Sequence, residues 1–395
     1  MFHQKVKLPL SALLLALYLE ATPAGSAANR VVAWGANDYG QTTVPASLTN
    51  ATFVAGGWRH SLALPTDGTL QGWGDDSVNQ LDFPAGESDF IAVACGQLHS
   101  VALRSSGQVL ATGYDAYGQT DVPLDLTNVV AIAGGFYHNL ALRADSTVAA
   151  WGTSANPAEI GTNPNYGQAI VPGNLSNVVA IAAGGYHNLV LLANGTLRAW
   201  GLDDNGQAEI PPGMSGIVGI AAGAGHNLVL KANGTVTAWG INDFGQTNVP
   251  PGLSNVVAIV AGGWHNLALR SDGTVVAWGG GAPSTNTLVS WGQNVVPAGL
   301  SNTVQVAAGL VDSFALVGAA PPVLHATLTG PVFRTNSFSL YSPTRNGRTY
   351  ALEYKNSLTD SNWTALPLKA GTGELLEFTD SAATAAHRFY RMRGW

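Results

Sequence analysis

Charged residues are scarce in this chain of 395 residues, where they make up only 10% of the composition, and the net charge is −7. The chain holds only 17 Lys and Arg, with no basic run after the first residues. A nucleic-acid surface needs Lys and Arg gathered on one face, so this composition argues against DNA or RNA as a partner. A hydrophobic content of 46% is too high for a disordered chain.

Cysteine is almost absent, because Cys95 is the only one, and an intrachain disulfide is therefore excluded. It lies in the run Ala94-Cys95-Gly96, where related segments have Ala or Gly. This context favours a small packing residue over a reactive thiol.

A long apolar run occurs only near the start of the chain. Lys5 and Lys7 precede the apolar segment 8–19, and small residues follow at 24–28. This order is typical of a secretion signal, so we expect residues 1–28 to be a signal peptide and the protein to be secreted, periplasmic or on the cell surface. An uncleaved anchor is the alternative, although the run is shorter than the ~20 residues of a membrane span. We expect no membrane span after cleavage.

Glycine (48 residues) and tryptophan (11 residues) recur in a repeated segment, AIVAGGWHNLALRSDGTVVAWG at 258–279 in its clearest copy. Each copy has a run of small residues, two variable positions, a histidine, an apolar strand, a tight turn and a strand ending in Trp-Gly. The period is 39 residues, with longer intervals of 49 and 47 where two copies carry insertions. The histidines are His60, His99, His138, His187, His226 and His265, and Asp312 takes the same position in a seventh copy. Such a period, built from strands and turns, indicates radial or solenoidal repetition.

The two ends of the repeat region complete each other. Residues 31–35 are a second strand without its first, and residues 307–316 are a first strand without its second. This offset predicts an all-β, seven-bladed β-propeller over 29–318, closed by pairing of the N-terminal strand into the last blade, because closure removes free edges. The period leaves room for three strands per blade. Val-Pro pairs in the linkers, such as Val249-Pro250, place those segments in connections or at outer edges.

These residues resemble a known family. The pattern AGGxxHxLAL…DGxVxAWGxNxxGQ is similar to the repeat of the regulator of chromosome condensation (RCC1) superfamily, and the short repeat with GQTTVPA at 40–46 resembles bacterial β-lactamase-inhibitory protein II. The resemblance implies a seven-bladed propeller with three-stranded blades, secreted, that grips a target enzyme with loop aromatics on one face. Guanine-nucleotide exchange, the best-known activity of the superfamily, fits poorly with export and an acidic chain.

Six histidines at one repeat position raise the question of a metal site. Zinc ligands must converge to about 2.0–2.1 Å from one ion, which positions spread around a ring do not allow. We therefore interpret each imidazole as hydrogen-bonded between strands of its own blade, and each Trp of Trp-Gly as packing between blades. No Ser or Cys nucleophile recurs with an acid partner. We predict no catalytic residue, no metal and no cofactor.

The two positions before each histidine are candidates for binding. They vary from Gly to Trp inside an otherwise strict repeat, and we expect them in the turn entering the innermost strand, on one face of the disc. Aromatic residues and Arg dominate binding hot spots, although the same residues can serve only to cover the core. The candidate binding residues are Trp58, Arg59, Phe136, Tyr137, Tyr186 and Trp264. A second aromatic position, at Tyr39, Tyr117, Tyr166 and Phe244, is interpreted as packing first and binding second.

Two insertions, at 154–165 and 280–290, break the period. Loops on a rigid scaffold often carry binding residues, but neutral drift in length also concentrates there. Both interpretations stay open.

The pattern changes after Ala319-Ala320-Pro321-Pro322, which we predict to be a linker at 319–322. Alternating segments in 323–395 predict a small β-sandwich of immunoglobulin or fibronectin type III character. The run LEYKNSLTDSNWTALP resembles a module at the end of exported proteins from Verrucomicrobia-like bacteria, which usually serves as a spacer or attachment unit.

Together these features predict a secreted, monomeric, non-catalytic scaffold that binds a protein partner, such as an extracellular or periplasmic enzyme, through one propeller face. Inhibition of a β-lactamase-type enzyme and binding of a cell-surface polysaccharide are the alternatives.

Overall fold

The computed structural model describes residues 29–153, 160–161, 164–280, 291–318, 328–334, 337–345, 347–357, 360, 363–383 and 388–394. The predicted signal peptide and linker lie outside these residues, as does most of both insertions. All elements in the described ranges are strands, and none of these residues belongs to a helix able to cross a membrane.

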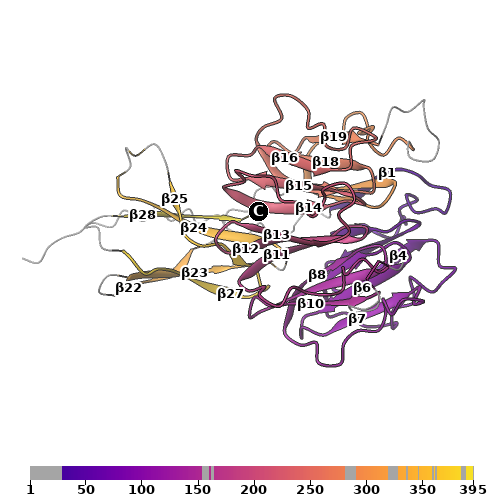
Figure 1. Ribbon diagram of the computed structural model, residues 1–395, viewed down its shortest axis with the longest axis horizontal. Helices are drawn as coiled ribbons and strands as arrows, with labels where there is room; N and C mark the ends of the chain where they lie inside the picture. Colours follow the sequence, from indigo (N-terminus) through magenta and orange to yellow (C-terminus); the bar gives the residue numbers. More distant parts are fainter. Residues whose placement is uncertain are drawn as a thin grey trace, which may run out of the picture.

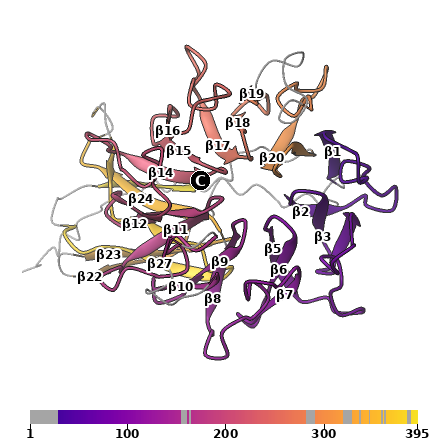
Figure 2. The same ribbon diagram turned by 45° about the vertical axis from the view of Figure 1, so that its right-hand side comes forward.

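Seven antiparallel sheets of three strands surround a central axis, which confirms the seven-bladed propeller (Figure 2). Blades 1 to 3 are β2 (Ala51–Gly56), β3 (His60–Pro65) and β4 (Gln71–Gly74); β5 (Phe90–Cys95), β6 (His99–Arg104) and β7 (Val109–Gly113); and β8 (Val129–Gly134), β9 (His138–Arg143) and β10 (Val148–Gly152). Blades 4 to 6 are β11 (Val178–Ala183), β12 (His187–Leu192) and β13 (Leu197–Gly201); β14 (Ile217–Ala222), β15 (His226–Lys231) and β16 (Val236–Gly240); and β17 (Val256–Ala261), β18 (His265–Arg270) and β19 (Val275–Gly279). Blade 7 is β20 (Thr303–Ala308), β21 (Asp312–Val317) and β1 (Arg30–Gly35).

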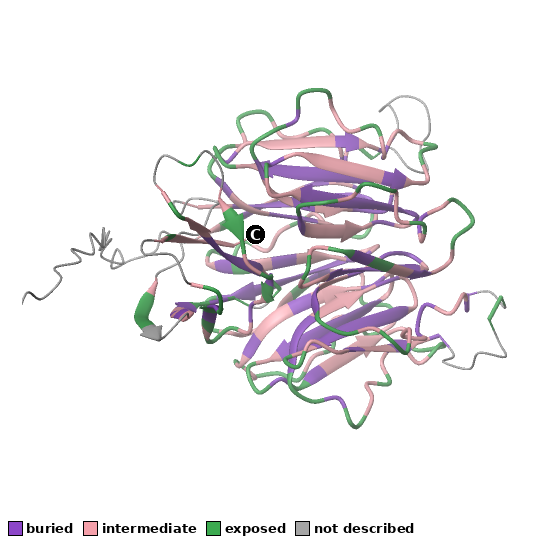
Figure 3. Ribbon diagram, turned by 60° about the vertical axis from the view of Figure 1, so that its left-hand side comes forward, coloured by how far each residue is buried: buried purple, intermediate pink, exposed green. Residues whose placement is uncertain are grey.

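The innermost strand of each blade is the run of small residues, which the sequence did not identify as a strand. β2, β5, β8, β11, β14, β17 and β20 contact one another around the axis, and six of the seven end in Ala or Gly next to the variable turn. The strand that begins with histidine is the middle one and is buried along almost its whole length (Figure 3). The two variable positions therefore lie in the turn that leaves the innermost strand, and our expectation of a turn entering that strand was wrong.

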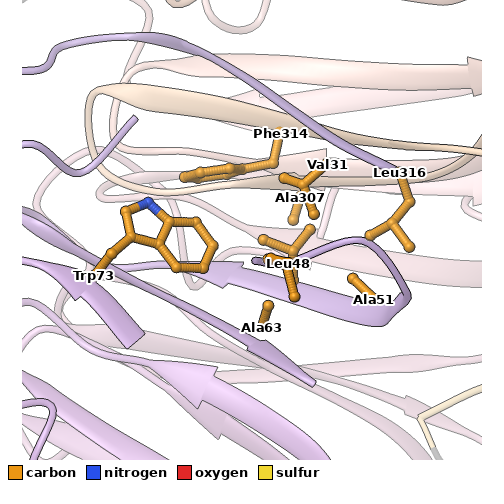
Figure 4. Close-up of a cluster of buried hydrophobic side chains, with 9 residues drawn as sticks. Val31, Leu48, Ala51, Ala63, Trp73, Ala307, Phe314 and Leu316 are labelled. Carbon is orange, nitrogen blue, oxygen red and sulfur yellow. The ribbon is translucent and has the colours of Figure 1, made fainter. Parts of the chain in front are cut away.

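The ring is closed by the N-terminal strand, as predicted. β1 pairs antiparallel with β21, from Arg30 opposite Val317 to Gly35 opposite Asp312. Across the seam to blade 1, Val31, Phe314 and Leu316 pack on Trp73 and Ala51 (Figure 4). A hydrophobic cluster, not only backbone pairing, thus holds the first and last blades together.

The disc has two different faces. Middle strands start at one face with histidine, outer strands end there with Trp-Gly, and His265 accordingly pairs with Gly279. We call this the His face; it carries the variable turns and the start of each connection between blades. The opposite face, called the hairpin face, carries the tight turns between middle and outer strands, such as Asp272-Gly273, where Gly273 has a φ of 80°.

The C-terminal strands form two further antiparallel sheets. One contains β22 (Thr329–Arg334), β23 (Ser337–Pro343) and β27 (Leu375–Asp380); the other contains β24 (Thr349–Lys355), β25 (Thr364–Ala365), β26 (Lys369–Ala370) and β28 (Phe389–Gly394). Phe338, Leu340, Leu352 and Phe378 form a core to which both sheets contribute. The immunoglobulin or fibronectin character of this part stays a prediction.

These sheets pack on the hairpin face at blades 4 and 5 (Figure 1). Leu368 N donates to Ala193 O at 2.9 Å, and Arg393 Nη1 donates to Ala232 O at 3.0 Å. Ala193 and Ala232 lie in the hairpin turns of these blades, and Ala351 and Leu368 join the cluster that contains Leu189 and Ile217. The C-terminal part therefore covers a section of the hairpin face and leaves the His face open.

Candidate functional site

A glycine fixes the path of each variable turn. A Cβ on Gly135 would lie 2.6 Å from Gly184 O of the next blade and closer still to Cε1 of His138. The equivalent glycines of the other histidine-bearing blades meet the same two obstacles, the next blade's carbonyl and their own histidine ring, and Gly309 of blade 7 meets Gly57 O and the Asp312 carboxyl. Neighbouring turns are also hydrogen-bonded to each other. Phe136 N donates to Gly185 O at 3.1 Å, and Gly263 N donates to Leu310 O at 3.0 Å. The backbone of the His face is thus rigid, whichever side chains the turns carry.

The histidines form a belt between blades. Each Nε2 lies 2.7–3.0 Å from the Asn Oδ1 or Ser Oγ at the second position of the next blade's middle strand. The same Asn or Ser donates to a Gln carbonyl, so its oxygen accepts from the histidine. From the sequence we expected each histidine to bond within its own blade, and this was wrong. The bond joins two neighbouring blades.

These hydrogen bonds determine which ring nitrogen of each imidazole carries the proton. Nε2 carries the proton, while all six Nδ1 atoms are buried without a partner among the described residues. Burial lowers the pKa of each ring from 6.5 to about 4, or to about 3 for His60 and His265. Among the described residues no group of three or more His, Cys, Asp or Glu is placed to hold a metal ion. The belt is a structural feature of the ring.

Asp312 interrupts the belt. It takes the histidine position in blade 7 and is fully buried, and neither carboxyl oxygen has a hydrogen-bond partner among the described residues. Burial raises the pKa of this carboxyl well above its usual range. In blade 1, Ser61 donates to Gln41 O like its counterparts but receives no bond from blade 7. The seam closed by β1 therefore lacks one bond that the other six blade contacts have.

The Gly-Gln pair of each connection is also structural. In five blades the Gln carbonyl accepts the ring N–H of the Trp in Trp-Gly, as Gln41 O does from Trp73 at 2.8 Å. Nε1 of Trp239 has no such partner among the described residues. The Gln side chain accepts the N–H two residues earlier, as in Tyr117 N to Gln119 Oε1 at 2.9 Å. The preceding Gly has a positive φ, and Asn79 takes that conformation at 62° in the one copy without Gly. The predicted role of Trp as a packing residue with a bonded ring nitrogen is confirmed for Trp73.

Three of the six predicted binding residues touch directly on the His face. Phe136 and Tyr137 of blade 3 and Tyr186 of blade 4 have ring centroids 5.4–6.5 Å apart. Tyr117 and Tyr166, from the neighbouring connections, pack on Tyr137 and Tyr186 at 5.1 and 5.3 Å. We call Tyr114, Tyr117, Phe136, Tyr137, Tyr166 and Tyr186 the aromatic cluster; Tyr114 contacts Tyr117 at 6.2 Å.

The phenols of Tyr137 and Tyr186 stay neutral. Burial, followed by the neighbouring Tyr117, raises the pKa of Tyr137. Burial, followed by the neighbouring Tyr137, raises the pKa of Tyr186 to about 12. These rings can contact a partner and donate hydrogen bonds, but they offer no base at neutral pH.

The other three predicted residues lie on the same face in two smaller groups. Arg59 of blade 1 stacks between two rings, with its guanidinium carbon 3.9 Å from the Trp58 ring centroid and 4.3 Å from that of Tyr39. Trp264 of blade 6 packs on Phe244 with centroids 6.4 Å apart. The six residues are half-buried and share one face, but they form three separate groups.

The second aromatic position lies partly at the surface. Tyr39 and Tyr117 are 44% and 39% exposed, so they are surface residues as much as packing residues. Trp291 holds the same position before Gly292-Gln293, is 39% exposed, and was missed although the Gly-Gln mark points to it. The described residues at the ends of both insertions, such as Ile160 and Gly280, also lie on the His face.

The variable turns surround an axial cavity of about 80 Å³. Its mouth is lined by the first variable residue of most blades, including Trp58, Gln97, Phe136 and Leu310, and by Cys95 below them. Burial raises the pKa of the Cys95 thiol, so it stays protonated. The cavity is too small for anything beyond water or a side-chain tip, and a larger ligand has to lie across the face.

Comparisons with known proteins identify the repeat. Residues 51–80, 90–119, 178–207, 217–246 and 256–282 match the Regulator of chromosome condensation (RCC1) repeat. No curated protein matches the chain.

Solved structures show the same fold. Prp20p from Saccharomyces cerevisiae, which was studied with its binding to Gsp1p and histones, has a TM-score of 0.59 at 19% identity, covering 75% of this chain and 93% of that one. Human WBSCR16 has a TM-score of 0.56 at 20% identity, covering 73% and 99%. The ectodomain of the Arabidopsis thaliana receptor kinase ACR4 has a TM-score of 0.51 at 20% identity, covering 66% and 90%. This chain therefore carries RCC1 repeats in a seven-bladed propeller of the RCC1 type.

Proposed function

We propose that this protein is a secreted, non-catalytic scaffold that holds a protein partner on its His face. The observation that carries the proposal is the concentration of aromatic residues on that face, at positions which the repeat leaves free. Trp and Tyr there are half-buried at their base and partly exposed, which is the usual state of residues that anchor an interface.

The state of the opposite face also favours the His face as the binding surface. The C-terminal sheets already pack on the hairpin face at blades 4 and 5. A disc with one face partly covered by its own chain has the other face available to a partner. The rigid backbone of the variable turns adds to this, because a preorganised surface loses little entropy on binding.

The binding of Gsp1p and histones by Prp20p and its complex with Kap60 lend further support, since they are uses of this fold in protein recognition. The partner of this chain need not be related to those proteins. An extracellular or periplasmic enzyme fits the secretion signal expected at 1–28, and inhibition of a β-lactamase-type enzyme is the sharpest form of this idea. We expect the scaffold to act as a monomer.

A surface polysaccharide is the competing ligand. Sugar chains stack on flat, coplanar rings, whereas most ring pairs of the aromatic cluster meet edge to face, at 63° to 82°. This uneven surface of ring edges and faces favours a protein surface, whose side chains can pack against it.

The test compares the chain from residue 29 onward with a variant in which Trp58, Phe136, Tyr137 and Trp264 are all changed to Ala. Each chain is used to capture secreted and periplasmic proteins of its host, and a purified class A β-lactamase is assayed separately. We expect a protein that binds the wild type and is lost by the variant, because anchors of this kind are each worth about 2 kcal/mol or more.

The matched control is Leu124→Ser, which removes a fully exposed apolar side chain from a connection away from the variable turns. It should bind like the wild type. A partner that binds the four-residue variant equally well, at unchanged thermal stability, would disprove the role of the His face. Unchanged β-lactamase activity would exclude only the hypothesis that the protein inhibits a β-lactamase-type enzyme.

A further inference from the structure

The charge of the His face is almost entirely negative. In the described variable turns and connections, Arg59 is the only basic residue. Seven aspartates occupy the first three positions after the outer strands: Asp38, Asp75, Asp76, Asp115, Asp203, Asp204 and Asp243. Six of them are exposed, and Asp75 is half-buried.

The fold does not require this charge at the second position after the outer strand. There an Oδ1 atom accepts the backbone N–H five residues on, at 2.7–3.0 Å, in five connections. Asp76, Asp115 and Asp203 make this bond, but Asn37 and Asn242 make the same bond without charge. An amide is therefore sufficient for the loop, and the carboxylates add only charge.

The third position leads to the same conclusion. Asp38, Asp204 and Asp243 are exposed, and no described residue bonds or pairs with their carboxylates. Ser77 and Ala116 hold the equivalent place in two other connections. Negative charge has thus accumulated around the aromatic residues at positions where a neutral side chain folds equally well.

Arg59 illustrates what such a face can bind. Its guanidinium lies over the Trp58 ring and beside Tyr39, in the arrangement by which aromatic faces attract cations. Asp38 precedes Tyr39 in the same loop. One group of rings on the His face therefore already holds an arginine side chain, supplied by the chain itself.

The aromatic cluster likewise combines aromatic rings with a nearby aspartate. Tyr117 and Tyr137 present rings 5.1 Å apart, and Asp115 lies in the loop between Tyr114 and Tyr117. No Lys or Arg of the described residues lies over these rings. Because Tyr117 is 39% exposed, the cluster offers an aromatic surface to a cation from outside.

We propose that the partner presents a basic segment, and that its arginine or lysine side chains lie over the exposed tyrosine rings of the aromatic cluster while the surrounding aspartates attract the segment. This inference rests on the proposed function, since it names the chemistry of the partner for the same face. Charge complementarity selects this occupant over an acidic or purely apolar surface.

The repeat supplies a matched pair of variants to test it. Asp76→Asn, Asp115→Asn and Asp203→Asn together remove three charges from the His face and copy the amide found at Asn37 and Asn242. Asp67→Asn, Asp145→Asn and Asp272→Asn remove three charges from the hairpin face and copy Asn194 and Asn233, which cap the equivalent turns. Both variants keep the fold and change the net charge equally.

The probe is a short peptide in which arginines alternate with glycine and serine, and its control carries citrulline, the neutral analogue, in place of arginine. Binding to the chain from residue 29 onward is measured by calorimetry at about 50 mM salt and again at about 300 mM. We expect the arginine peptide to bind and the citrulline peptide not to bind. The His-face variant should lose about tenfold in affinity, and the hairpin-face variant should not change. A third variant, Tyr117→Ser with Tyr137→Ser and Tyr186→Ser, should lose at least as much.

Equal weakening by both charge variants would mean nonspecific attraction to an acidic protein and would overturn the inference. So would absence of binding, or full binding by the tyrosine variant. The proposed function is judged separately: a captured partner that needs the aromatic residues but is insensitive to the His-face aspartates and to salt would support the function and refute the basic segment.

Discussion

The histidine belt makes the propeller sensitive to acid in a pH range where few other groups titrate. Each ring is held neutral in the folded chain, with a pKa lowered from 6.5 to about 4 or 3, and becomes protonated on unfolding. A folded pKa below the unfolded one gives stability that is complete above pH 6.5 and is lost as the pH falls through the folded value. Protonating Nδ1 would place an N–H in a buried position with no acceptor.

The size of the effect follows from the number of protons taken up. Between pH 6 and 5 most of the six histidines are protonated in the unfolded chain and almost none in the folded one, a difference of about five protons. Asp312 offsets about one of these protons, because its raised pKa keeps the carboxyl protonated in the folded chain while it ionises on unfolding. At ~1.4 kcal/mol per proton and pH unit, the free energy of unfolding should therefore fall by about 5.5 kcal/mol over that unit. Because folded domains are stable by only about 5–15 kcal/mol, we expect the propeller to unfold at a midpoint between about pH 4 and 5.5.

Urea unfolding followed by tryptophan fluorescence at a series of pH values between 7 and 5 measures this slope. His226→Gln provides the control, because Gln keeps a donor toward Asn266 but does not titrate, and it should reduce the slope by about 1.4 kcal/mol per pH unit. The opposing proton of Asp312 is common to both chains and cancels in the difference between their slopes. A wild-type slope equivalent to fewer than about two protons would show that the histidines are not held neutral.

Three further perturbations follow from the same architecture. Asp312→His should stabilise the ring by about 2 kcal/mol at pH 7 in chemical denaturation, since a buried carboxyl is removed and Ser61 gains a donor as in the other blades; no gain would show that the seam cannot accept the belt. Gly135→Ala should lower the stability by about 3 kcal/mol or prevent folding, because the new Cβ meets His138 and Gly184 O; a normal melting temperature would contradict that close approach. Leu368→Glu should release the C-terminal sheets from the hairpin face, visible as increased cleavage between the two parts by a protease, while the propeller melts unchanged.

The blades could be predicted from the sequence because their signals are local and repeated. The turn at Asp272-Gly273 and the strands on either side of it are marked by residue type alone. The innermost strand was missed although Val and Ile, which favour strands, make up most of β17 (VVAIVA). Only the end of this strand that leads into the variable turn consists of Ala and Gly, and that run of small residues obscured the strand signal. Ring closure was predictable because β1 and β21 each lack one partner within their own repeat.

The binding face could be predicted only in part. Variation between Gly and Trp inside a strict repeat correctly placed Phe136 and Tyr186 on one face, but contact between them depends on the curvature of the ring. The unpaired carboxyl of Asp312 and the docking of Leu368 on Ala193 depend on distances between segments far apart in the sequence. No pattern in one repeat encodes them.

In the propeller, the residues that stabilise the ring differ from those that face outward. This difference determines which substitutions the His face can accept. Glycine, histidine and glutamine bond between blades and fix the backbone, so changes at Gly135 or Gln119 should lower the stability of the ring. The side chain of Tyr137 extends from that backbone, and Asp115 bonds to it only through an oxygen that an amide can equally supply. Substitutions on the His face should therefore alter binding with little effect on stability, which is the property that lets one scaffold acquire different partners.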